Sequence, residues 1–291
     1  MFRYVRPLAV VAVLAGFFFA GPSRADAEIF SVRLSYGAAH IAPSDLNDFL
    51  ADFVRARRDA GYSLTGGLRS LDWSNEFEVA FRVPLSARLS VLASAGLIGA
   101  EQSANDFGFA TDSGTGNYTR TDRIRSIAVR LGLAYAVPLS GRLTLRPHAG
   151  LDGYWTSFQD SGGAFFGLSG WEPQAEWEWT ANTNAFNFGY TLGVGLDIAL
   201  GSRLSVGLDA GWRGAKLTGF EGKIQVIQAG LAADPQNIRV SFSRESIPGL
   251  NGDYAALNLP FLWPGGMIKG TRDAVLDLSG IYGSAGLKIS F

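Results

Sequence analysis

Few side chains of this sequence could carry out covalent or metal chemistry, because the chain has two histidines and no cysteine. His148 is followed by Ala149 and Gly150, so the His-x-Ser spacing of one hydrolase dyad is missing. No Asp-x-His pair occurs in the sequence, so His40 lacks the acidic partner that an outer-membrane protease would need. No His-x-x-x-His motif or cysteine cluster offers a zinc site. The sequence therefore predicts a protein that is not an enzyme, without catalytic residue, cofactor or metal, and makes a hydrolase the least favoured function.

Charged residues instead recur at every second position of several segments, in alternation with apolar residues. Successive side chains of a β-strand point to opposite faces, so these charges share one face. The set comprises Arg33, Glu76, Glu78, Arg82, Arg130, Arg146, His148, Asp152, Asp197, Asp209, Arg213 and Lys288. One interpretation is a selectivity filter. The favoured one is a network of ion pairs that plugs a narrow interior, because buried charges must be paired.

Three similar turns indicate how the strands that carry these residues are connected. The sequence VPLSARLS at 83–90 recurs as VPLSGRLT at 137–144 and as IALGSRLS at 198–205. Proline, serine and glycine between alternating segments are typical of tight hairpins. The six strands around the turns are predicted at 73–83, 88–101, 121–137, 142–155, 185–200 and 203–213.

A first strand at 30–36 and a last strand at about 274–291 raise the predicted number to eight. The last strand breaks phase near Gly280, which predicts a bulge. Short turns at one end and long connections at the other predict an all-β fold, a transmembrane antiparallel up-and-down β-barrel. The alternative is ten strands, with a further pair within 214–272.

Aromatic residues on the outward face fall at two levels of this barrel. Rings prefer the interface between membrane and water, so two girdles are expected to flank an apolar band. The upper girdle comprises Tyr36, Trp73, Trp155, Phe186, Phe188 and Trp212, and the lower one Phe30, Phe81, Tyr135 and Phe291.

The first residues are typical of an export signal. Arg3 and Arg6 precede an apolar run that is too short to span a bilayer, and small residues follow it. We expect cleavage between Ala27 and Glu28, which leaves 28–291 as the barrel. A net charge of −1 gives no reason to expect a nucleic-acid partner.

The chain closes with Gly-Leu-Lys-Ile-Ser-Phe at 286–291, an alternating strand with a terminal phenylalanine. Together with the eight strands, this ending resembles the small outer-membrane barrels that include the OmpA membrane domain, OmpX and OmpW. The resemblance implies the outer membrane of a Gram-negative cell, contact with lipid and lipopolysaccharide, and recognition of Phe291 by the insertion machinery. It carries over no site residues.

Four long extracellular loops are expected, at about 38–72, 102–120, 156–184 and 214–272. Within the first, 44–58 has the apolar spacing of a helix that packs on the rim. Within the third, the Trp/Glu alternation at 171–179 predicts an extension of the hairpin, or else a binding site for sugars or a partner. The fourth contains an apolar stretch with Phe261 and Trp263, which predicts a lid over the barrel or contacts to a hydrophobic ligand or partner.

The function that these features favour is a structural or surface-interaction role for a barrel with a plugged lumen. The alternative, implied by the OmpW-like resemblance, is a narrow channel for small hydrophobic molecules.

Overall fold

The computed structural model describes residues 29–111, 114–168, 175–228, 231–232, 234–246, 253–257 and 267–291. Eight antiparallel strands form a closed ring, because the last strand pairs with both β9 and β1. In ring order they are β1 (Ser31–His40), β3 (Trp73–Pro84), β4 (Leu89–Thr111), β5 (Gly114–Tyr135), β7 (Leu143–Leu168), β8 (Ala175–Ala199), β9 (Leu204–Gly214) and β18 (Gly280–Ser290). The predicted eight-stranded barrel is confirmed, and the ten-stranded alternative is wrong.

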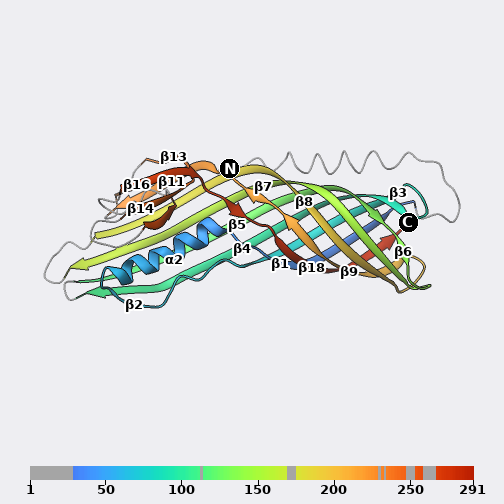
Figure 1. Ribbon diagram of the computed structural model, residues 1–291, viewed down its shortest axis with the longest axis horizontal. Coiled ribbons are helices and arrows are strands. Elements are labelled where there is room, and N and C mark those ends of the chain that lie inside the picture. Colours follow the sequence, from blue (N-terminus) through green and yellow to red (C-terminus); the bar gives the residue numbers. More distant parts are fainter. Residues whose placement is uncertain are drawn as a thin grey trace.

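The three predicted turns have the same local structure. In each, the amide of the leucine that opens the turn donates to the carbonyl of the leucine four residues on, at 2.8–2.9 Å: Leu85 to Leu89, Leu139 to Leu143, and Leu200 to Leu204. In the first turn, the Ser86 hydroxyl also accepts from the Leu89 amide at 3.0 Å. The repeated sequence therefore encodes a repeated hairpin, and all three hairpins lie at one end of the barrel (Figure 1).

At the other end, four strands run far beyond the length needed to cross a membrane. β4, β5, β7 and β8 have 22 to 26 residues, whereas about 9–11 residues span a bilayer. Much of the predicted loops 102–120 and 156–184 is therefore strand, and Trp177 and Trp179 extend the hairpin as predicted. The long ends project to the left in Figure 1, away from the short turns.

A folded cap fills and covers these long strand ends. Its helix α2 (Ser44–Asp59) lies against a three-stranded sheet of β14 (Ser241–Ser246), β15 (Asp253–Leu257) and β16 (Met267–Asp273). β11 (Glu221–Gln228) continues the wall beside β8 and also pairs with β13 (Gln236–Arg239) and β12 (Leu231–Ala232). The remaining short strands are β2 (Ser63–Thr65), β6 (Val137–Pro138), β10 (Lys216–Leu217) and β17 (Leu276–Asp277).

The cap has a hydrophobic core of its own. Leu46 and Leu50 of α2 are buried, and Phe53 packs with its ring centroid 4.6 Å from that of Tyr118 on β5. The core continues through Phe107, Ile124, Phe158, Trp179, Leu217, Phe220, Ile224, Val240, Leu257, Leu276 and Leu278. The predicted helix is confirmed, and its apolar face packs inside the extended wall.

The last strand is shorter than predicted. Only Gly280–Ser290 belongs to the barrel, and its register with β1 and β9 runs without a shift, so the bulge predicted near Gly280 is wrong. The break in alternation marks the place where the chain leaves the cap, in which Leu276 pairs with Leu217 of β10. A Cβ atom on Gly280 would collide with the His40 carbonyl oxygen, so the close approach of β1 requires a glycine here.

Several predicted features lie outside the described residues: Ala27 and Glu28 of the cleavage site, Trp171, and the candidate lid or ligand contacts Phe261 and Trp263. No helix in the described part of the chain is long and apolar enough to cross a membrane.

Candidate functional site: the charged interior of the barrel

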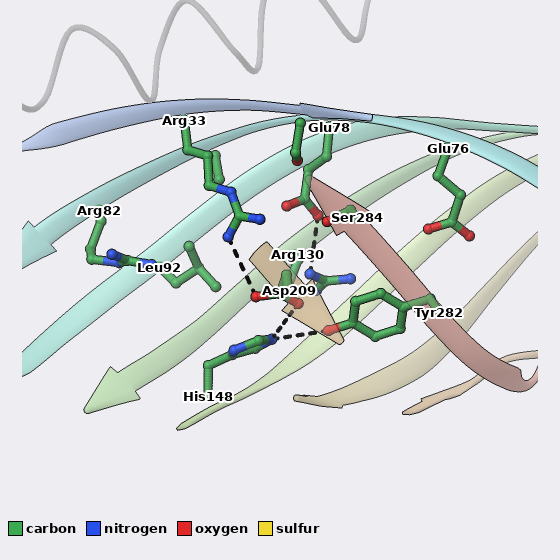
Figure 2. Close-up of a pocket in the computed structure, with 12 residues that line it drawn as sticks. Arg33, Glu76, Glu78, Arg82, Leu92, Arg130, His148, Asp209, Tyr282 and Ser284 are labelled. Atoms are coloured by element: carbon green, nitrogen blue, oxygen red, sulfur yellow. Dashed lines mark hydrogen bonds and ion pairs between the residues drawn. The ribbon is translucent and has the colours of Figure 1, made fainter. Parts of the chain in front are cut away.

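The predicted charged set lies together inside the lower part of the barrel, which is defined here as the part between the short turns and the upper aromatic girdle. Strand alternation directs these side chains inward from seven of the eight strands. Figure 2 shows Arg33, Glu78, Arg130, His148 and Asp209 converging from different strands. The charged side chains of the interior form three clusters, each held together by its own contacts, and one separate ion pair.

The first cluster surrounds Asp197 of β8, close to the short turns. Its Oδ2 atom accepts from Arg146 at 2.6 Å, from Lys288 at 2.9 Å and from Arg82 at 3.3 Å. Three strands, β3, β7 and β18, thus place a cation on one carboxylate. Asp197 and Lys288 are both buried, so each depends on the other for compensation of its charge.

The second cluster is centred on Arg130 of β5. Its Nε atom donates to Asp152 at 2.7 Å and its Nη1 atom donates to Glu78 at 3.0 Å, which joins β5 to β7 and β3. Asp152 also accepts from the hydroxyls of Tyr154 at 3.2 Å and Thr191 at 2.5 Å. Arg130 is therefore held by two carboxylates, one of which is itself held in place by hydroxyl groups.

The third cluster joins His148, Tyr282, Asp209 and Arg33. The Nε2 atom of His148 lies 3.0 Å from the Tyr282 hydroxyl and 3.7 Å from Asp209, and Arg33 lies 3.4 Å from the other Asp209 oxygen (Figure 2). A Cβ atom on Gly193 would lie within 2.6 Å of both the His148 ring and the Tyr282 hydroxyl, so the absence of a side chain there makes room for the contact.

Arg213 and Glu76 form an ion pair nearest the cap. The Nε atom of Arg213 also donates to the carbonyl of Leu278 at 3.0 Å, which ties the top of the lumen to the segment that enters the cap. Arg213 is almost completely buried.

The charges of this interior nearly cancel, and its side chains leave little free volume. Its six cations are Arg33, Arg82, Arg130, Arg146, Arg213 and Lys288, and its five carboxylates are Glu76, Glu78, Asp152, Asp197 and Asp209. A cavity among the described side chains, lined by Arg33, Glu78, Arg130 and Tyr282, has a volume of about 40 Å³. A volume of that size holds only a few water molecules.

Sequence reasoning missed the two tyrosines of this network. Tyr282 lines the cavity and Tyr154 donates to Asp152. The phase break near Gly280 conceals that Tyr282 faces inward, and the charge pattern does not single out Tyr154. His40 lies apart from the network. It is exposed on β1 and meets the ring of Trp73 edge to face at 5.5 Å.

A second charged cluster, also missed, lies in the cap core above the membrane-spanning segments. Arg120 of β5 contacts Asp122 at 2.9 Å and Asp160 of β7 at 3.2 Å, and all three side chains are buried. Trp179 donates to Asp160 at 3.2 Å, and the Arg120 guanidinium lies over the Phe49 ring of α2 at 4.6 Å. Burial raises the pKa of Asp160 to about 7, although the Arg120 charge opposes the shift.

Among solved structures, the chain is similar to the outer membrane protein OprG of Pseudomonas aeruginosa (12% identity, TM-score 0.36, 91% of this chain and 97% of that one). It is also similar to a major outer membrane protein of Thermus thermophilus (14% identity, TM-score 0.36, 90% and 99%) and to CarO of Acinetobacter baumannii (9% identity, TM-score 0.31, 88% and 97%). No curated protein matches the sequence.

The family match covers most of the chain. Residues 9–243 match the outer membrane protein beta-barrel domain. The closed ring of eight antiparallel strands and the apolar outer band agree with that assignment. The chain therefore belongs to the outer membrane protein beta-barrel domain family, and its location is the outer membrane of a Gram-negative cell.

Proposed function

We propose that this protein is a closed, non-catalytic barrel that anchors a folded extracellular cap, with a structural or surface-interaction role. The observation that carries the proposal is the pairing of the lumen charges. Each of the five lumen carboxylates contacts at least one cation, and Asp197 contacts three. An interior in which the charges hold one another is suited to sealing the barrel.

The size of the barrel supports the same conclusion. Eight strands enclose just enough space for side chains, and here that space is occupied by arginines, a lysine and a tyrosine. An ion that crossed the lumen would have to separate ion pairs which are shielded from water. Above the lumen, the hydrophobic core of the cap lies across the route to the cell surface.

The cap supports the surface-interaction part of the proposal. Its helix and three-stranded sheet are held by Arg272, which donates to both carboxylate oxygens of Asp45 at 2.6 Å, and by Arg244, which contacts Asp52 at 2.9 Å. A cap with a packed core and these two ion pairs presents a defined surface.

Planar-bilayer recording of the refolded protein tests the proposal. The wild-type barrel is expected to give no steady conductance. Arg130→Ala should produce leak events because it leaves Glu78 and Asp152 without the cation between them, whereas the control Arg142→Ala, at an exposed turn, should stay silent. A stable, charge-selective conductance of the wild-type protein would show that the charges form a filter.

The alternative, a narrow channel for small hydrophobic molecules, has less support. The side chains that line the described cavity are mostly charged or polar. An apolar solute in this cavity would remove water from these groups without replacing its hydrogen bonds, which is unfavourable. Uptake of an apolar dye into vesicles that contain the wild-type barrel distinguishes the two functions, because a plugged barrel should not accelerate it.

Export and assembly complete the proposal. We propose that residues 1–27 are removed after export, that Phe291 is read by the insertion machinery, and that lipid and lipopolysaccharide surround the barrel. In the folded protein the Phe291 ring stacks on Phe30 at 4.7 Å, and its amide donates to the Phe30 carbonyl at 2.9 Å. The terminal residue thus also fastens the last strand to the first.

A further inference from the structure

We propose that Arg125 of β5 is the centre of a binding site for the phosphate group of a lipid in the outer leaflet of the membrane. The site lies on the outside of the barrel, where the apolar band meets the polar wall of the cap. It is independent of the lumen, and it rests on the proposed placement of lipid and lipopolysaccharide around the barrel.

The position of Arg125 relative to the membrane follows from the residue pattern of its own strand. Outward side chains of β5 are apolar from Tyr135 up to Ile127, and from Arg125 onwards they are polar. Ile127 pairs with Trp155 of the upper aromatic girdle on β7. The next outward position is therefore at the level of the lipid headgroups, because aromatic girdles mark the membrane interface.

Arg125 is unusual among the residues at that level. On the six described strands that continue above the band, the first outward residues are Ala38, Gly99, Arg125, Ser157, Asn184 and Gly214. Arg125 alone carries a charge. A headgroup anion that approaches the described wall at this height thus meets one positive sector, between β4 and β7.

The neighbours of Arg125 leave room for a bulky anion. Its partner on β4 is Gly99, where an added Cβ atom would meet no heavy atom within 4 Å, and its partner on β7 is Ser157, a small residue with a hydroxyl donor. Arg125 is exposed between these two small residues. A guanidinium with such access can make two-point contact with a phosphate.

The local charges favour an anion as well. Arg125 is exposed and, among the described residues, has no ion-pair partner, whereas Arg123, the next outward residue above it, is paired with Glu101 at 2.6 Å. The Glu101 carboxylate also interacts electrostatically with Arg125, so two arginines and one glutamate leave this sector with a net charge of +1. Below it, Leu97, Ile127 and Trp155 provide an apolar surface against which acyl chains can lie. A phosphorylated, acylated lipid satisfies both surfaces at once, which a free phosphate ion does not.

Native mass spectrometry of the detergent-solubilised protein, titrated with lipid A, tests the site. Wild-type protein should retain the phosphorylated lipid, and enzymatic removal of its phosphates should weaken retention. Arg125→Gln should weaken binding about fivefold, the effect of one arginine near an anionic surface, and Arg125→Lys should weaken it less. Arg58→Gln is the matched control, since Arg58 is an exposed arginine near the end of α2, in the cap.

Three results would overturn the proposal. They are equal binding by wild type and Arg125→Gln, equal retention of lipid with and without phosphates, and displacement of the lipid by inorganic phosphate alone at low concentration. The first would place the binding elsewhere, the second would make it purely apolar, and the third would indicate a phosphate site instead of a lipid site. Because Arg125 is exposed, its replacement should leave folding intact, and the heat-dependent mobility of the barrel on gels checks this.

Discussion

The barrel in the membrane and the cap above it are built on the same strands but have opposite polarity. In the lower barrel, apolar side chains such as Leu131 and Leu151 face outward and charges such as Arg130 face inward. In the cap, Tyr118, Ile124 and Phe158 face inward and polar residues face outward. A period of two residues is kept along all of β5. The solvent on the outside, lipid below and water above, decides which face is apolar.

The two interiors differ in what holds them together. The lumen is held by ion pairs between strands, whereas the cap is held by burial of apolar surface around α2. The described part of the cap nevertheless contains a buried charge cluster, Arg120 with Asp122 and Asp160, packed against Phe49 of α2. The comparison therefore predicts that the two regions respond differently to the same kind of substitution.

The largest expected effect is in the lumen. Asp197→Ala leaves Arg82, Arg146 and Lys288 without their shared carboxylate, and removing one partner of a buried pair costs about 3–5 kcal/mol. Urea unfolding of the barrel in lipid vesicles measures the loss. The control Asp234→Ala removes an exposed carboxylate and should change the unfolding free energy by less than about 0.5 kcal/mol. Equal effects of the two variants would mean that the lumen pairs do not stabilise the barrel.

A cavity in the cap core should act locally. Leu50 of α2 is 1% exposed, and Leu50→Ala is expected to destabilise the cap by about 2–5 kcal/mol through lost transfer energy and an unfilled cavity. Hydrogen exchange should become faster in α2 and β15 while the lower barrel keeps its protection. Leu151→Ala, at a residue that is 73% exposed on the lipid face, is the control and should leave exchange in the cap unchanged. Faster exchange throughout the barrel would show that the two regions unfold as one unit.

The outer surfaces of the barrel and of the cap can be compared by introducing the same charged residue on each. Leu131→Arg puts a guanidinium in the apolar band and should cost about 2–4 kcal/mol if it lies near the bilayer midplane. Thr180→Arg puts the same group on the exposed wall of the cap, where the cost should be close to zero. Refolding yields and unfolding free energies in vesicles give both values. A similar cost at the two positions would contradict the assignment of the band to lipid and the wall to water.

The last comparison of the two regions concerns pH. The pKa of Asp160 is raised from 3.8 to about 7 by burial, and this group lies above the membrane-spanning segments. A carboxyl whose pKa is raised on folding stabilises the cap fully below the unfolded pKa, and the contribution is lost as the pH rises through the folded pKa. Exchange protection of the cap, corrected for the intrinsic rate, should therefore be greater at pH 5 than at pH 8. In Asp160→Asn the difference should vanish, and its persistence there would assign it to another group.

The parts of the fold that could be predicted from the sequence are those set by short-range sequence patterns. The repeated turns at 83–90, 137–144 and 198–205 place six strands without any tertiary information, because a hairpin turn is set by its own residues. Alternation then places Arg130, Asp197 and their companions on one face. Their partners could not be predicted, since the contact of Arg130 with Glu78 joins residues 52 positions apart on strands whose register the sequence leaves open.

What the sequence by itself determined is the barrel: the six strands around the repeated turns, its direction of polarity and the charged residues inside it. Only the tertiary structure decided how the cap is built around the predicted helix at 44–58. The outward residues of β4, β5, β7 and β8 become polar above the membrane, so the same strands no longer carry the pattern of a membrane barrel and were predicted as loops. Their inward apolar residues are explained only by α2 and the segments after β9, which fill the space between them from distant parts of the chain. A core of that kind depends on long-range packing, which no local periodicity encodes.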